Sequence, residues 1–145
     1  MELSCKSEYA LLALIELATH YTKGEPLQIR QIAAGQNIPD RYLEQLLATL
    51  RRGGLVRSLR GAKGGYLLAR EPWKITLLET LECIEGTNGK ALPSTDRPST
   101  IESEIVRDIW QEVRERANAV LQKYTLQDLK EQREARQQVN IMYYI

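Results

Sequence analysis

Apolar residues recur every three to four positions in three stretches of the first half of the chain, which is the spacing of amphipathic helices. These stretches predict helices over residues 7–21, about 29–34, and from near Pro39 through Leu50. Gly35 stands where a left-handed residue would close the second helix, and two glycines follow the third. Only about four residues separate the second and third helices. So short a turn between two helices predicts a helix-turn-helix.

The pattern changes to short β-prone runs after the third helix. Residues 55–60 and 66–70 flank the glycine-rich turn 61–65, and this arrangement predicts a β-hairpin. A hairpin directly after a helix-turn-helix is a wing. Thr76 to Glu79 then has the capping-box pattern of a helix that reaches about Gly86.

Periodicity is lost over residues 86–99, a length typical of a functional or disordered loop, and it returns in the longest helix. A second capping box, from Ser99 to Glu102, begins that helix, which spans about 24 residues or ~36 Å. Its apolar stripe is Ile101, Ile105, Ile109, Val113, Ala117, Val120, Leu121 and Tyr124. Because a small winged-helix body cannot cover this length, we expect a homodimer joined by the stripe, mainly at Ile101, Ile105, Ile109, Val113 and Val120. A monomer with the helix folded back is the alternative.

These elements define the expected fold: mainly α with a small β-hairpin, a winged helix-turn-helix followed by a long C-terminal dimerisation helix. The expected units are the DNA-binding domain over residues 1–75, a helix and sensor-type loop over 76–98, and the dimerisation helix with a C-terminal helix and tail over 99–145. A polar helix restarts at residues 125–128, and 139–145 is an apolar tail.

Composition is that of a globular protein, with 43% hydrophobic and 27% charged residues. No apolar run approaches the roughly 20 residues of a membrane helix, and the first residues do not follow the order of a secretory leader. Two cysteines, Cys5 and Cys83, suggest a reducing compartment. We therefore expect a cytoplasmic protein with no membrane partner.

The net charge of +1 conceals a basic block. Residues 41–70 contain seven basic side chains and one acid, a net charge of +6, so the remainder of the chain carries −5. A basic surface in an acidic background is expected of a protein that neutralises DNA phosphates, although a solvated basic face is the alternative.

The first two turns of the third helix carry side chains that can read bases. Glu44 can accept from the cytosine amino group, Gln45 can pair with adenine, and Arg41 can pair with guanine. An acid within a basic block weakens attraction to phosphate, which favours base reading by Glu44 over a surface role. Tyr42 either contacts phosphate or packs its ring against the wing.

The turn of the wing carries Arg60 and Lys63 among glycines that include Gly64 and Gly65. An arginine on such a hairpin fits the minor groove, where narrow tracts concentrate negative potential. Lys63, Arg51 and Arg52 are expected to contact phosphates. A nucleotide-binding loop is disfavoured because the Walker spacing is missing.

Neither catalytic nor metal-binding groups cluster along the sequence, so we expect no enzyme and no metal site. The single histidine, His20, has no cysteine or acid cluster around it and is interpreted as structural. Cys83 is interpreted as a packing residue, and a redox role is the alternative.

Three stretches resemble the Rrf2 family of winged-helix regulators, which includes regulators that hold iron–sulfur clusters. These stretches are residues 4–10, 42–46, and 50–56 with 60–68, and the resemblance is strong to about residue 86 and weaker beyond it. It implies a dimer crossed at the long helix, a two-fold operator, base contacts from Glu44 and Arg60, and phosphate contacts near Lys6, Ser7 and Tyr9.

The chain departs from the family at the loop cysteines. Many members hold a [2Fe-2S] or [4Fe-4S] cluster on three loop cysteines, whereas residues 86–104 contain none, and Glu104 and Arg107 align with a cysteine and a histidine of some relatives. A cluster is therefore disfavoured and we expect no cofactor. The expected function is a bacterial, sequence-specific, DNA-binding transcriptional regulator, a repressor acting as a homodimer on double-stranded DNA. The alternatives are a protein-interaction module that regulates a metabolic enzyme and a thiol-based redox sensor.

Overall fold

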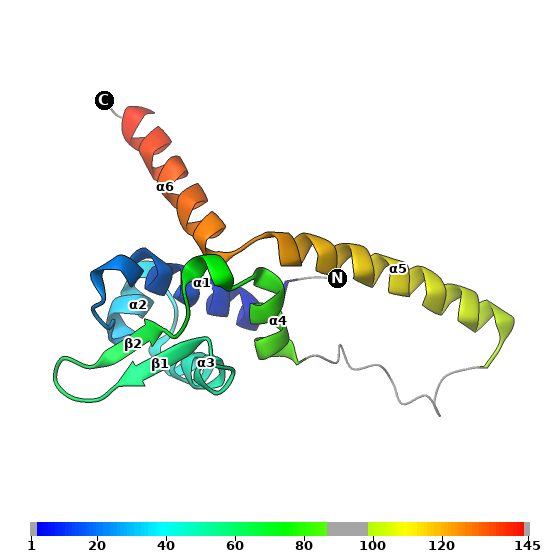
Figure 1. The fold of residues 1–145 in the computed structure, drawn as a ribbon, viewed down its shortest axis with the longest axis horizontal. Helices are drawn as coiled ribbons and strands as arrows, with labels where there is room; N and C mark the ends of the chain where they lie inside the picture. The colour runs from blue at the N-terminus through cyan, green and yellow to red at the C-terminus, as the bar shows by residue number, and fades with distance from the viewer. Residues whose placement is uncertain (1–2, 87–98, 144–145) are drawn as a thin grey trace.

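The computed structural model describes residues 3–86 and 99–143, which form mainly helices and one hairpin (Figure 1). Residues 3–86 are called the recognition half, after the recognition helix expected within them. Their elements, in chain order, are α1 (Cys5–Thr19), the 3₁₀ turn η1 (Tyr21–Lys23), α2 (Ile29–Gln36), α3 (Asp40–Arg52), β1 (Val56–Leu59), β2 (Gly65–Leu68), the 3₁₀ turn η2 (Pro72–Lys74) and α4 (Leu77–Glu85). Two further helices follow, α5 (Ile101–Lys123) and α6 (Leu126–Tyr143). The predicted fold class is confirmed, and α1 begins and ends two residues earlier than the apolar pattern predicts.

One apolar core joins α1, α2, α3, the hairpin and α4. In α3 the inward positions follow the helical period, and Leu43, Leu46, Leu47 and Leu50 are all buried. Burying a leucine stabilises a fold by roughly 1.5–3 kcal/mol, so these four side chains fix α3 firmly on the body. The opposite face of α3 is left to solvent.

The hairpin is attached to the helix-turn-helix by its second strand. The strands β1 and β2 are antiparallel, with Val56 opposite Leu68 and Leu59 opposite Gly65. An isolated bridge pairs Leu27, just before α2, with Tyr66 of β2. The wing and the start of α2 therefore share backbone hydrogen bonds, which fixes the wing beside the helix-turn-helix.

Two predicted helix boundaries are wrong. Gly35 lies inside α2, and the left-handed residue that closes the helix is Asn37, with φ of 56°. The long helix is capped by Thr100 and not by Ser99, since the Thr100 hydroxyl accepts a hydrogen bond of 3.1 Å from the backbone N–H of Ser103. Ser99 has the glutamate three residues later that completes a capping box, but the backbone places Thr100 at the N-cap position.

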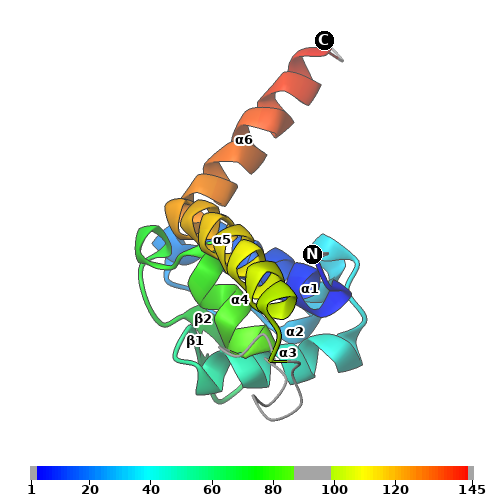
Figure 2. The same cartoon turned by 90° about the vertical axis from the view of Figure 1, so that its right-hand side faces the viewer.

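The helices α5 and α6 project from the body in different directions (Figures 1 and 2). The first turns of α6 pack on α1 and η2, whereas α5 contacts α4 and extends outward. Most of the expected sensor-type loop, and Tyr144 and Ile145 of the apolar tail, lie outside the described residues. No helix in the described ranges has both the length and the apolar character needed to cross a membrane.

Candidate nucleic-acid interface

The exposed face of α3 brings together the three side chains expected to read bases. Arg41, Glu44 and Gln45 are all exposed, and their spacing of three and four residues puts them on one face of the helix. The buried leucines hold the opposite face. A rigid helix that presents an arginine, a carboxylate and an amide in its first two turns has the geometry of a recognition helix.

The ring of Tyr42 packs on α1. Its ring meets the ring of Tyr9 edge to face, with centroids 5.5 Å apart and an angle of 78° between the planes. Both side chains are partly buried. The contact ties the beginning of α3 to the beginning of α1, so these two expected DNA-contacting residues lie side by side.

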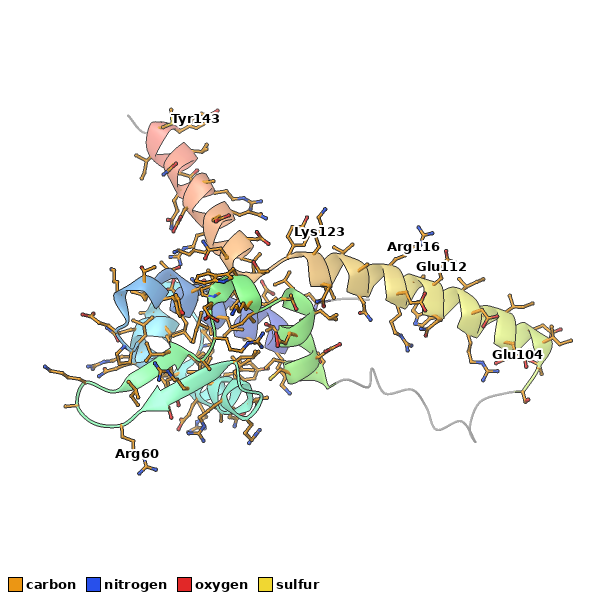
Figure 3. The ribbon with its side chains drawn as sticks, viewed as in Figure 1. Arg60, Glu104, Glu112, Arg116, Lys123 and Tyr143 are labelled. Atoms are coloured by element: carbon orange, nitrogen blue, oxygen red, sulfur yellow. The ribbon has the colours of Figure 1, made fainter. Side chains whose placement is uncertain are left out.

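The turn of the wing extends beyond the body and carries exposed basic side chains. Arg60 points away from the hairpin, and Lys63 is also exposed (Figure 3). Gly64 is buried in the turn and Gly65 begins β2. The last turn of α3 carries two further arginines: Arg51 donates to the Ser58 hydroxyl across 3.3 Å, and Arg52 donates to the Thr49 hydroxyl across 3.3 Å. Arg51 thus links the end of α3 to the wing, and both elements carry exposed basic side chains.

One member of the basic block is directed elsewhere. Arg70 forms an ion pair with Glu79 of α4 and donates a 2.7 Å hydrogen bond to the carbonyl oxygen of Lys74. The guanidinium therefore links the end of the wing to η2 and α4. We do not count Arg70 among the DNA-facing charges.

Ser7 differs from the other residues expected to contact phosphate near the start of α1. Its side chain is buried, and its hydroxyl donates to a carboxylate oxygen of Glu85 across 2.7 Å. Ser4, the N-cap of α1, donates to the same oxygen. Lys6 is exposed and Tyr9 is partly buried, so the Lys6 and Tyr9 side chains are more accessible than that of Ser7.

The sequence predicted no role for Glu85, which accepts hydrogen bonds from the start of α1. Hydrogen bonds from Ser4 and then Ser7, together with the positive charge of Lys6, lower the pKa of Glu85, against a smaller opposing effect of burial. The carboxylate joins the end of α4 to the start of α1 across 78 residues of sequence. Ser4 could have been recognised as an N-cap from its position before the helix, but no local pattern indicates its partner.

Cys83 packs against the last turn of α3. Its thiol lies 3.6 Å from the carbonyl oxygen of Thr49, and a Cβ added to Gly53 would overlap its sulfur. Burial raises the pKa of Cys83, with a further contribution from Glu79 and an opposing one from Arg52. The thiol form is thereby favoured, as expected of a packing residue. Cys5, at the start of α1, is exposed.

The apolar stripe of α5 is exposed along the helix. Its isoleucines and valines have exposed fractions from 39% at Val113 to 74% at Ile101, whereas Ala117, Leu121 and Tyr124 are half-buried. No residue of α5, which is described over its whole length, is buried. Val106 and Trp110 widen the stripe. An apolar surface of this extent on a projecting helix marks an interaction surface.

His20 lies at the end of α1 and contacts the backbone of that helix. It is partly buried, and its ring Nδ1 lies 3.0 Å from the carbonyl oxygen of Glu16 in α1. Within residues 3–86 and 99–143, no three histidine, cysteine or acidic side chains gather into a group that could hold a metal ion.

Comparison with known proteins extends the similarity over nearly the whole chain. A model of the Rrf2 family, described as an iron-dependent transcriptional regulator, matches residues 3–132. The chain is 36% identical over 143 residues to the HTH-type transcriptional regulator CymR of Bacillus subtilis, covering 99% of each chain. It is 32% identical over 130 residues to the HTH-type transcriptional regulator IscR of Xenorhabdus nematophila, covering 89% of this chain and 79% of that protein.

Solved structures agree. The structure of IscR from T. potens matches with a TM-score of 0.77 and 33% identity, over 94% of this chain and 91% of that one. The structure of CymR of B. subtilis, described as its global cysteine regulator, matches with a TM-score of 0.75 and 35% identity, over 90% and 97%.

Proposed function

The chain belongs to the Rrf2 family and is a sequence-specific, DNA-binding transcriptional regulator, and we propose that it acts as a homodimer that reads a two-fold operator through Glu44 and Arg60. One observation carries the assignment of these residues. The exposed face of α3 holds Glu44, and the adjacent wing holds Arg60, both on elements fixed by the buried core.

The division of labour follows from the chemistry of each side chain. Glu44, Gln45 and Arg41 meet base edges in the major groove, where carboxylate, amide and guanidinium groups discriminate between bases. Arg60 enters the neighbouring minor groove, where a narrow groove attracts arginine. Positioning on phosphates comes from the exposed basic side chains and the two partly buried tyrosines around them: Lys6, Tyr9, Tyr42, Arg51, Arg52 and Lys63. The buried Ser7 hydroxyl is left out of this set because it is committed to Glu85.

The homodimer is supported by the exposed stripe of α5. Helices of two copies bury the stripe by crossing at their apolar faces, which is the commonest symmetric solution for a soluble oligomer. Charge favours an antiparallel crossing. The first half of α5 is mainly acidic, with Glu102, Glu104, Asp108 and Glu112 against Arg107, whereas the second half carries Arg114, Arg116 and Lys123 against Glu115. An antiparallel pair sets each acidic half beside a basic half.

An iron–sulfur cluster does not fit the residues of this chain. Such clusters need several thiolates, and the sequence has two cysteines. Cys83 packs against Gly53, and burial raises its pKa, which favours the thiol over the thiolate. Cys5 is exposed at the start of α1. We therefore propose that DNA binding does not require a cluster, and that repression follows when the bound dimer occupies a promoter.

Direct binding tests this function. The purified protein is titrated with duplexes selected by the protein itself from random DNA, and with a scrambled duplex of the same composition, at several salt concentrations. We expect the selected duplex to bind at least about a thousandfold more tightly than the scrambled one. Equal affinity for both duplexes at every salt concentration would refute specific recognition.

Two substitutions separate base reading from phosphate contact. Glu44→Ala should reduce discrimination at one base pair of each half-site by about 5- to 100-fold, because a base contact is lost. Lys63→Ala should weaken all duplexes alike and reduce the slope of log affinity against log salt by about 1 per lost phosphate contact. If Glu44→Ala instead lowers affinity uniformly with unchanged base preference, Glu44 is not a reading residue.

A further inference from the structure

A buried carboxylate joins three helices on the side of the body that holds α6. Glu16 of α1 is 6% exposed, and its Oε1 accepts a hydrogen bond of 2.7 Å from Nε2 of Gln36. The same oxygen lies 2.9 Å from Nη1 of Arg133, in the third turn of α6. Arg133 also donates to the Thr19 hydroxyl across 3.2 Å. Arg133 is thus bound twice by α1, and Glu16 connects it to the last residue of α2.

The site is shaped around this carboxylate. A Cβ on Gly35 would lie 3.0 Å from both Cδ and Oε1 of Glu16, which is closer than normal packing allows. The glycine inside α2 therefore lets the helix approach the carboxylate closely. Among the described residues, the cation that pairs with Glu16 is Arg133, whose side chain is 31% exposed. Removing Arg133 would leave the buried Glu16 carboxylate without its cation, which is destabilising.

The pair adds to several other attachments between the body and the C-terminal helices. The Leu126 side chain is fully buried in the core, and α5 contacts α4. A β-bridge also joins Thr76 to Thr125, at which Leu126 donates to the carbonyl oxygen of Ile75 across 2.9 Å. The contacts of Thr125 and Leu126 lie at the start of α6, whereas Arg133 lies about two turns further along and restrains the direction of α6 there.

The helices α5 and α6 are joined by a short connection, since only Tyr124 and Thr125 separate them. The carbonyl oxygen of Tyr124 accepts a hydrogen bond of 2.9 Å from the backbone N–H of Leu77. The Asp128 carboxylate accepts hydrogen bonds from the backbone N–H and the hydroxyl of Thr125, at 2.9 and 3.2 Å, which caps the start of α6. Because the connection is so short, we expect the direction of α6 to restrain that of α5.

We propose that the Glu16–Arg133 pair sets the angle between the recognition half and the dimerisation helix, and so determines the half-site spacing that the dimer accepts. This inference rests on the proposed homodimer. Because α5 is about 35 Å long, a rotation of about 10° at its connection to α6 moves its far end by about 6 Å. That displacement exceeds the rise of about 3.4 Å per base pair, so it shifts where the second recognition helix meets the DNA.

The test compares operators that differ only in spacing. A palindromic duplex selected from random DNA by the unchanged protein is remade with its half-sites one and two base pairs closer and further apart, and a single half-site is measured beside them. The variants are Arg133→Ala and the matched control Arg136→Ala, which removes an exposed arginine of the same helix. Thermal melts followed by circular dichroism establish that each variant is folded.

The unchanged protein and Arg136→Ala should prefer one spacing over its neighbours by about tenfold or more, because only one phase presents both half-sites. Arg133→Ala should reduce that preference to within about threefold while its affinity for a single half-site stays within about twofold. Arg133→Lys, which restores the charge, should recover most of the preference. These results together support the inference.

An unchanged spacing profile in Arg133→Ala would overturn the inference. So would a uniform loss at every spacing and at the single half-site, since that result describes a purely structural residue. If Arg133→Ala does not fold, the comparison rests on Glu16→Gln, which removes the charge of the carboxylate, with Arg133→Lys as the charge-conserving control. A profile in Glu16→Gln as narrow as that of the unchanged protein would then overturn the inference. Failure of the unchanged protein to prefer any selected duplex would instead refute the proposed function, and this inference with it.

Discussion

The recognition half, residues 3–86, and the helix α5 treat their apolar side chains in opposite ways. In the recognition half the leucines and isoleucines of four helices and a hairpin meet in one core. In α5 the isoleucines and valines of the stripe face solvent. The first region buries its apolar side chains within a single chain, whereas the stripe of α5 has the exposure expected of one half of the proposed dimer interface. In the proposed function, the recognition half reads DNA and α5 joins two chains.

Disrupting the stripe should have the largest effect. We expect Ile109→Asp to convert a dimer into a folded monomer, because the carboxylate would be buried against a second copy without a partner. Affinity for a palindromic duplex should fall by about 100-fold or more, since two linked half-sites are then no longer bound together. Sedimentation equilibrium measures the mass and fluorescence anisotropy measures the affinity.

Asn118→Glu is the control for that substitution. Asn118 is exposed on α5 but lies outside the apolar stripe, so the added charge should leave the dimer intact. A dimer that survives Ile109→Asp with unchanged affinity would contradict the assignment of the stripe.

A smaller effect is expected from a substitution in the recognition half, where Gly53, at the end of α3, packs closely against Cys83 of α4. The added methyl of Gly53→Ala would overlap the sulfur of Cys83, so α4 must shift. We expect a loss of about 1–3 kcal/mol in the free energy of unfolding, measured with urea. Adding Cys83→Ala should recover part of that loss by making room. If the double variant loses the sum of the stabilities lost by Gly53→Ala and Cys83→Ala alone, the overlap with the sulfur does not cause the loss in Gly53→Ala.

The smallest effect concerns the link between α4 and α1. Because the pKa of Glu85 is lowered in the folded state, its carboxylate stabilises the fold above its unfolded pKa of about 4.3, and this stabilisation is lost as the pH falls through the folded pKa. Glu85→Gln should therefore lower the free energy of unfolding at pH 7, by less than about 1 kcal/mol because the group is exposed. Urea titrations from pH 7 to pH 3 should show the difference shrinking, and a difference that grows on acidification would contradict the assignment.

The same division explains what the sequence could predict. The apolar period marked α3, and residue type alone indicated Glu44 and Gln45 on its exposed face. The capping pattern marked the helix that follows Thr76, whose hydroxyl accepts from the backbone N–H of Glu79. Local patterns carry information over a few residues, and these features extend over no more than that.

Contacts between distant residues could not be predicted in this way. The family resemblance implies a phosphate contact near Ser7, but no local pattern indicates that the Ser7 hydroxyl bonds to Glu85, 78 positions away. Gly35 was wrongly predicted to end α2, because the carboxylate of Glu16 that lies against it belongs to another helix. Neither contact leaves a signal in the local sequence, since each depends on a residue of a distant segment.

The most direct test of the account is the mass of the complex on a palindromic duplex selected from random DNA, measured by native mass spectrometry or sedimentation. We predict two chains per duplex for the unchanged protein, and none or one for Ile109→Asp at the same concentration. A complex of the unchanged protein that contains a single chain, or the absence of any specific complex, would contradict the claim that α5 joins two recognition halves on one operator.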